Sequence, residues 1–153
     1  MNLGWMRPGD WLAGIAGLVL LLSLFLNWYV APGGAGRSGW EAFSVIDILL
    51  ALAALFGIAV AVAAGARRTP ALPVALAIFA VVAGVLATLL ALLRVIDAPA
   101  DGFALAIGAG VGLVSAVAMT AGAFWALKDE RNRGVPMPSV EVRPAPPAGP
   151  AAS

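Results

Sequence analysis

The chain alternates between long apolar runs and short segments rich in charge, glycine or proline. The apolar runs cover residues of about 11–30, 44–66, 70–96 and 103–127. A helix of about 20 residues, rising ~1.5 Å per residue, spans the ~30 Å hydrocarbon core of a bilayer. The pattern therefore predicts an all-α fold, a bundle of four transmembrane helices.

Aromatic residues flank the first run, as is typical of a transmembrane helix. Trp11 lies at its start, and Trp28 and Tyr29 lie near its end, where aromatic belts meet the lipid headgroups. The Ala-Pro-Gly-Gly sequence at 31–34 then predicts a helix stop. A cleaved signal peptide is the alternative, but the run is long for one, and proline follows Ala31 in place of a small-x-small site.

Polar residues at the starts of the runs fit helix caps. Asp10 is placed to cap the first helix. Ser44 and Asp47 have the three-residue spacing of a capping box at the start of the second. These positions predict helix starts and need no catalytic role.

Composition agrees with a lipid-facing protein and excludes much chemistry. Of 153 residues, 62% are hydrophobic and 11% are charged, whereas soluble domains are about half apolar and a quarter charged. The chain has no cysteine and no histidine, so it lacks thiol nucleophiles, the commonest general base and the commonest metal ligand. We expect no catalytic residue, no metal, no cofactor, no enzyme activity and no nucleic-acid partner.

The distribution of basic residues predicts the orientation, because lysine and arginine gather on the cytoplasmic side of a membrane. The four predicted helices place most of the nine basic residues on one side and two on the other. Both termini should therefore be cytoplasmic. Arginine is preferred to lysine and alanine is abundant, which favours a GC-rich bacterial genome and a multi-pass protein of the bacterial inner (cytoplasmic) membrane. The larger basic group is Arg7, Arg67, Arg68, Lys128, Arg131, Arg133 and Arg143, and the smaller is Arg37 and Arg94.

The chemistry changes after the last run, which predicts a transmembrane domain over 1–128 and a tail over 129–153. The tail is rich in proline and alanine and has no apolar run able to form a core. It should be a disordered, flexible cytoplasmic segment. Pro144 and Pro147 have the spacing of a proline-rich ligand, although a solvated tail explains the same composition.

The helices offer little polar chemistry at mid-membrane depth. No ionisable residue lies in the middle of a run, where one would indicate an ion or proton path. The polar residues there are Ser23, Asn27, Thr88, Ser115 and Thr120. This inventory argues against a channel or an ion-coupled transporter that acts alone.

Small residues recur every four positions in the fourth run, at Gly108, Gly112, Ala116 and Thr120. Small side chains let two helix backbones approach closely, which holds helices together in lipid. The stripe is therefore a candidate helix-packing face. It could bind a partner or a second copy of the chain, or it could serve close packing within the bundle.

The longer outer segment between the first two runs contains a second candidate, an outer-rim interaction site formed by Arg37, Trp40, Glu41 and Asp47. The charged side chains could bind a cation or a partner at the membrane surface. Headgroup anchoring by Trp40 and capping by Asp47 explain the same residues without a ligand.

The first hairpin carries a resemblance. Leu-Asn-Trp-Tyr at 26–29, Gly-Trp-Glu-Ala-Phe at 39–43 and then Asp47 resemble small four-helix integral membrane proteins of GC-rich bacteria, of the actinobacterial type. The second hairpin matches them in hydropathy alone. The resemblance implies a fold and a membrane location, and it implies no activity.

These observations favour a non-catalytic accessory or scaffold subunit that packs against the bilayer and a membrane-protein partner, or forms a homo-oligomer. The alternative is a component of an oligomeric transporter or channel, in which Asn27, Thr88 and Thr120 would face a shared watery cavity. A lipid enzyme is a third hypothesis and would need Glu41 or Asp47 as an essential carboxylate.

Overall fold

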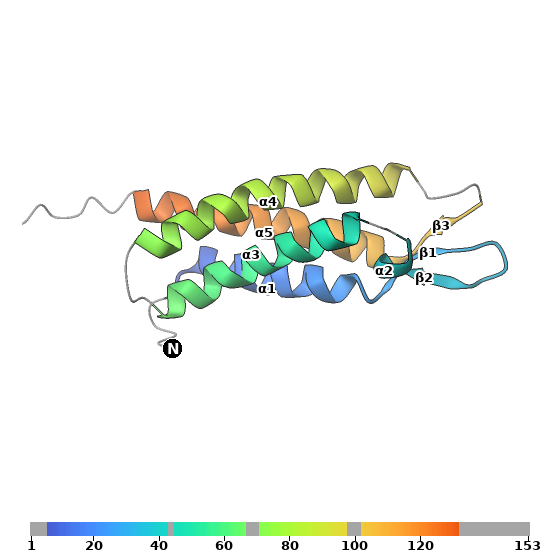
Figure 1. Cartoon of the computed structure of the whole chain (residues 1–153), viewed down its shortest axis with the longest axis horizontal. Helices are drawn as coiled ribbons and strands as arrows, with labels where there is room; N and C mark the ends of the chain where they lie inside the picture. Colours follow the sequence, from blue (N-terminus) through green and yellow to red (C-terminus); the bar gives the residue numbers. More distant parts are fainter. Residues whose placement is uncertain (1–5, 43–44, 67–70, 98–101, 132–153) are drawn as a thin grey trace, which may run out of the picture.

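The computed structural model describes residues 6–42, 45–66, 71–97 and 102–131. Its long helices lie side by side along one axis (Figure 1). They are α1 (Pro8–Ser23), α3 (Ile46–Ala66), α4 (Ala71–Ile96) and α5 (Ile107–Arg131).

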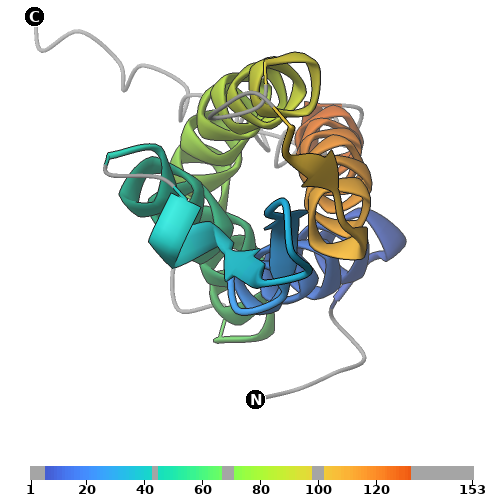
Figure 2. The ribbon, with the colours of Figure 1, turned by 90° about the vertical axis from the view of Figure 1, so that its right-hand side faces the viewer.

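The long helices form a ring when seen along their axis (Figure 2). α1 packs against α3 and α5, and α4 packs against the same two neighbours from the other side. α1 and α4 therefore lie across the ring from each other. Consecutive helices run in opposite directions, so the start of α1 lies at the same end as the start of α4.

Three of the helices are long and apolar enough to cross a membrane. The qualifying segments are Ile46–Ala66, Ala75–Ile96 and Ile107–Asp129. The prediction of membrane-length apolar helices is confirmed for these three runs. α1 has 16 residues and is about 24 Å long, short of the ~30 Å hydrocarbon core.

A small antiparallel sheet covers one end of the helices, at the right of Figure 1, which corrects the expectation of a purely helical chain. β1 (Asn27–Val30) lies between β2 (Gly36–Ser38) and β3 (Ala104–Leu105). The β1–β2 hairpin turns through Gly33 and Gly34, whose φ angles of 104° and 90° favour glycine. These strands were not predicted from the sequence, because they are short and lie inside or beside apolar runs.

The first apolar run is not a single helix, so the prediction of a helix over 11–30 is wrong for its last third, residues 24–30. α1 ends at Ser23, and the next three amides, 24–26, donate to carbonyls three residues back. The indole N–H of Trp28 then donates to the Ser23 carbonyl at 2.8 Å. The Ser23 carbonyl thus accepts from both the Leu26 amide and the Trp28 indole, which fixes the ring against the end of α1.

The last run is also displaced from its predicted bounds of 103–127. Its first residues pair with β1 as β3, so α5 begins only at Ile107. α5 continues to Arg131, past the expected domain boundary at 128. The predicted tail from 132 onward lies outside the described residues.

Asp10 and Ser44 were predicted to cap helices, and the described structure confirms neither prediction. Asp10 lies at the third position of α1, where its carboxylate accepts from the backbone N–H of Arg7 at 2.9 Å, so it is not the N-cap residue. Ser44, the other half of the expected capping box with Asp47, lies outside the described residues.

The interior of the ring is filled mainly by alanine and by a few large side chains near the sheet. Trp28 and Tyr29 are fully buried there. Large apolar side chains instead project outward, as a lipid-facing surface requires. Examples with exposed fractions of 47% or more are Ile15, Leu18, Phe25, Ile48, Leu52, Val82, Leu89, Val114 and Phe124.

Candidate functional site

The first two members of the α5 stripe face a tryptophan inside the protein. A side chain on Gly112 would collide with the Trp28 ring, and one on Gly108 would meet the backbone oxygen of Asn27 at 2.5 Å. β1 therefore lies almost directly on the surface of α5. At these two positions the small residues make room for Trp28.

The other two members of the stripe also face neighbouring helices. Ala116 is fully buried. Thr120 lies against Gly84 of α4, where an added methyl group would come within 2.5 Å of the threonine hydroxyl. The stripe Gly108, Gly112, Ala116 and Thr120 thus lies within or at the edge of the helix ring.

Hydrogen bonds attach β1 to two helix ends. Trp28 donates to the Ser23 carbonyl, as described above, and the Tyr29 hydroxyl donates to the carbonyl of Arg94. That carbonyl belongs to the last turn of α4, where side chains from elsewhere in a protein commonly contribute hydrogen bonds. The phenol therefore completes the end of α4 from another part of the chain.

The outer-rim residues belong to separate local contacts. Glu41 accepts from the backbone N–H of Ser38 at 2.9 Å and from the Ser38 hydroxyl at 3.1 Å. These bonds, helped by the charge of Arg37, hold the pKa of the Glu41 carboxyl below its ordinary value of 4.5. Glu41 is the third residue of the short helix α2 (Gly39–Ala42), so the pattern is a capping contact. The Ser38–Glu41 spacing could have been recognised in the sequence.

The remaining rim residues face aromatic rings or the interior. Trp40 packs on Phe25, with ring centroids 5.7 Å apart. The Arg37 guanidinium lies 5.8 Å from the Phe103 ring centroid, within cation–π range. Asp47 is buried and accepts from the N–H of Ile48 at 2.7 Å. The structure therefore gives each predicted rim residue its own partner and does not gather the four around a common centre.

A groove between α4 and α5 is the larger of two recesses on the described part of the chain, with a volume of about 420 Å³. It opens on the outward face of the two helices and is lined almost entirely by apolar side chains. Thr88 and Thr120 are its polar residues. The lining consists of Val81, Val85, Thr88, Leu89, Val117, Thr120, Ala121 and Phe124.

The two threonine hydroxyls meet in this groove with their oxygens 3.4 Å apart. Each also reaches the carbonyl four residues back, Thr88 to Gly84 and Thr120 to Ala116, both at 2.8 Å. The two hydroxyl groups have two protons between them, whereas three contacts are present: one to each helix carbonyl and one between the two oxygens. When both protons point to the helix carbonyls, the oxygens present only acceptor lone pairs to each other and to the groove.

Asn27 does not share this place. It lies in β1 against Gly36 and the start of α5, next to Gly108. Thr120 is twelve residues further along α5, about 18 Å of helix. The three polar residues expected around a common cavity therefore divide into a threonine pair and a separate asparagine.

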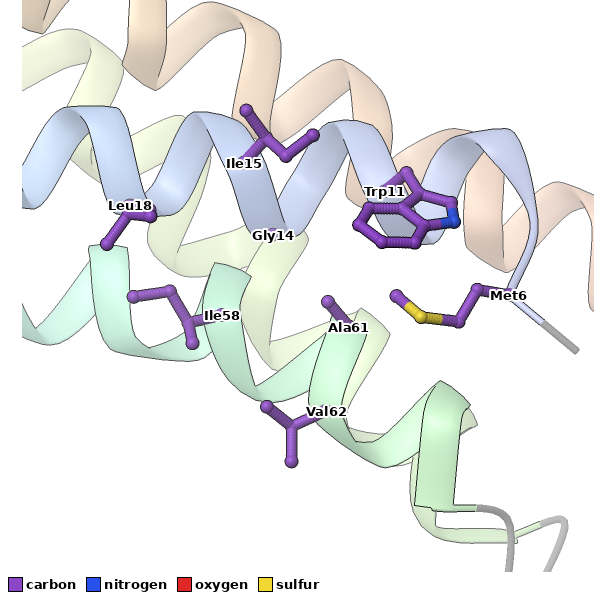
Figure 3. Close-up of a pocket in the computed structure, with 8 residues that line it drawn as sticks. All are labelled: Met6, Trp11, Gly14, Ile15, Leu18, Ile58, Ala61 and Val62. Atoms are coloured by element: carbon purple, nitrogen blue, oxygen red, sulfur yellow. The ribbon is translucent and has the colours of Figure 1, made fainter. Parts of the chain in front are cut away.

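A second groove, of about 210 Å³, lies between α1 and α3 (Figure 3). Trp11, Ile15 and Leu18 line it from α1, and Ile58 and Val62 line it from α3. The α1/α3 groove has no pair of hydroxyl side chains like Thr88 and Thr120. Its lining residues are apolar apart from the indole N–H of Trp11. Both grooves are apolar, and they differ in size and in the two threonines among the residues of the larger one.

Within the described ranges, no group of three acidic residues is placed to hold a metal ion. Comparison of the chain with family models, with curated proteins and with solved structures gave no significant match. The resemblance of the first hairpin to actinobacterial four-helix membrane proteins therefore stays a prediction.

Proposed function

We propose that the chain is a non-catalytic accessory subunit of a bacterial cytoplasmic membrane that binds a transmembrane helix of a partner protein in the α4/α5 groove. The observation that carries the proposal is the groove itself, an outward-facing apolar recess with a polar pair on its floor. Polar contacts between helices are a common means of association in lipid.

Four membrane passes are part of the proposal. Three helices have the required length. α1 supplies about 24 Å, and the 3₁₀ turn of residues 24–26 adds about 6 Å, which together match a bilayer core of ~30 Å. Arg7 and Lys128 lie at the end opposite the sheet, which supports cytoplasmic termini and an outer sheet.

The α5 stripe does not serve as the partner face in this proposal. Gly108 and Gly112 already contact β1, and Ala116 is buried, so none of the three offers a free surface. An accessory role must then use the outward faces of the helices. The α4/α5 groove has the larger volume of the two recesses described on those faces, about 420 Å³ against about 210 Å³.

Affinity purification from native membranes in mild detergent tests the proposal, with two matched substitutions. Ala121→Trp fills the α4/α5 groove, and Val62→Trp fills the α1/α3 groove. Both side chains are outward-facing, so both variants should fold. We expect a stoichiometric partner with the parent chain and with Val62→Trp, and its loss with Ala121→Trp. Equal recovery with all three would refute the groove as the binding site.

A component of an oligomeric transporter or channel is the second candidate, favoured by the polar pair Thr88–Thr120 deep in the helices. In that case the pair would face water between protomers. The chain has no cysteine, so single cysteines at these two positions can be read without background. Reaction with a water-soluble thiol reagent in native membranes would favour a pathway, and resistance would favour a lipid- or helix-filled groove.

A further inference from the structure

We propose that the α1/α3 groove holds an acyl chain of an anionic phospholipid, whose headgroup phosphate binds the guanidinium of Arg7. The lipid belongs to the leaflet at the end of the bundle opposite the sheet, where α1 begins. The site depends on the helices crossing the bilayer, and it is independent of what fills the α4/α5 groove. The charge of Arg7 and the position, depth and narrow lining of the groove support it.

The guanidinium of Arg7 forms no ion pair within the described part of the chain. Its Nη1 atom is covered by protein and has no hydrogen-bond partner there, although the residue is only partly buried. Asp10, the acidic residue nearest along α1, is buried and accepts from the backbone N–H of Arg7 at 2.9 Å. An anion beside the guanidinium would offset this unpaired charge and accept from its remaining N–H groups.

Arg7 lies at one end of the α1/α3 groove. The backbone N–H of Trp11 donates to the Arg7 carbonyl at 3.1 Å, which places Arg7 one helical turn before Trp11. Met6, the neighbour of Arg7 in the chain, lines this end of the groove with Trp11, and Leu18 lines the other end (Figure 3). The groove therefore runs from the first turn of α1 toward the middle of the bilayer, with a basic residue at its outer limit.

The depth of the groove matches a single leaflet. Trp11 and Trp125 are exposed, and Gly9 packs against Ala126, so the two tryptophans lie near the same level. Exposed tryptophans near helix ends are typical of the boundary between hydrocarbon and headgroups. From Trp11 to Leu18 the groove covers about 10 Å, which fits within half of the ~30 Å hydrocarbon core. The groove is thus level with the acyl chains, and the residue one turn before Trp11 is level with the headgroups.

The size and lining of the groove suit an acyl chain better than a helix. Its α3 wall extends from Ile58 to Val62, about one helical turn or ~6 Å. A helix ~10 Å wide would contact this wall over that one turn, whereas a flexible chain can lie along it. The lining is apolar apart from the Trp11 indole N–H at the headgroup end. Neither a charged nor a hydroxyl group is therefore buried by hydrocarbon in the groove.

The charge of the headgroup should decide which phospholipid binds. Basic sites between transmembrane helices bind anionic headgroups, and arginine donates paired hydrogen bonds to phosphate. A zwitterionic lipid also has a phosphate, but its cationic group lies close to the same guanidinium and is repelled by it. We therefore expect Arg7 to select a headgroup with a net negative charge, and the groove to retain its chain.

Native mass spectrometry of the full chain in detergent tests the proposal with phosphatidylglycerol and phosphatidylcholine of identical acyl chains. Arg7→Gln removes the charge, Arg7→Lys keeps it, and Arg37→Gln removes a basic residue at the sheet end. Val62→Trp fills the α1/α3 groove, and Ala121→Trp is the matched change in the α4/α5 groove. Circular dichroism checks that each variant is folded.

We expect the parent to bind one phosphatidylglycerol about fivefold more tightly than one phosphatidylcholine. Arg7→Gln should bind the two lipids equally, whereas Arg7→Lys and Arg37→Gln should keep the preference. Val62→Trp should lose the tightly bound lipid, and Ala121→Trp should retain it. Equal binding of both lipids by the parent, or a preference that survives Arg7→Gln, would overturn the proposal. A preference lost in Arg7→Gln but unchanged in Val62→Trp would also overturn it, because phosphate would then bind without the groove.

Discussion

The two ends of the α5 stripe differ in what covers them, although the small residues have the same four-residue spacing at both ends. Toward the sheet, Gly108 and Gly112 are covered by β1 and the Trp28 ring. Away from the sheet, Thr120 meets Gly84 and lies at the floor of an open groove. The first end is sealed and the second is accessible.

The elements packed against α5 cause this difference in accessibility, because the stripe itself has small residues along its whole length. β1 supplies a large ring that fills the space left by Gly112. α4 supplies another glycine, so the helices approach closely at one point and leave a recess beside it. A stripe of small residues therefore predicts close approach, and the opposing side chains decide whether the surface is closed.

The largest effect is expected at the sealed end. Gly112→Leu should destabilise the protein by about 3 kcal/mol or more, because the new side chain must displace the buried Trp28 ring. Denaturant unfolding in detergent, followed by circular dichroism, measures the change. Gly110→Leu is the control, since an added side chain there meets nothing within 4 Å. Similar losses in the two variants would contradict the assignment of the sealed end.

The contact between Gly112 and Trp28 can be tested further by combining substitutions. Trp28→Ala alone should cost about 3 kcal/mol or more through lost packing and a lost hydrogen bond to Ser23. Trp28→Ala with Gly112→Leu should be more stable than the sum of the single effects predicts, by about 1–2 kcal/mol, because leucine occupies the vacated space. Strict additivity in the unfolding free energies would show that the two residues do not touch.

The attachment of β1 to α4 should have a smaller effect. Tyr29→Phe removes the hydroxyl that donates to the Arg94 carbonyl and should lower the free energy of unfolding by about 1 kcal/mol. Hydrogen exchange should speed up locally at the last turn of α4. Unchanged exchange there would mean that the phenol does not complete this helix end.

The smallest effect concerns the outer loop and pH. Hydrogen bonds from Ser38 lower the pKa of Glu41, so its contribution to stability is complete above 4.5, its ordinary value, and is lost as the pH falls through the lower folded value. The amide resonance of Ser38 should titrate with that lowered pKa. In Glu41→Gln the titration should vanish, and its persistence would exclude Glu41 as the acceptor.

The sequence predicts the long apolar helices well, because hydropathy and length are local properties. It predicts the bounds of α4 closely, since the expected 70–96 becomes Ala71–Ile96. It does not predict the end of α1 at Ser23. That end depends on Trp28 finding a place on α5, more than eighty residues away in the chain, and no local pattern encodes such a contact.

The candidate site was predictable only in part. Thr88 and Thr120 were recognisable as polar residues within apolar runs, yet their pairing depends on Gly84 and on which helices are neighbours. The grouping of Arg37, Trp40, Glu41 and Asp47 followed from their nearness in the sequence. In three dimensions they lie in β2, α2 and α3, and their nearest contacts are with different partners.

The most direct test of the account compares photocrosslinking from the two grooves in native membranes. A photoreactive amino acid at Leu89 faces the α4/α5 groove, and one at Val62 faces the α1/α3 groove; the native side chains are similarly exposed, at 53% and 49%. We predict a discrete protein adduct from position 89 and only lipid adducts from position 62. A protein adduct from position 62 alone, or none from position 89, would contradict the assignment of the α4/α5 groove to a partner helix.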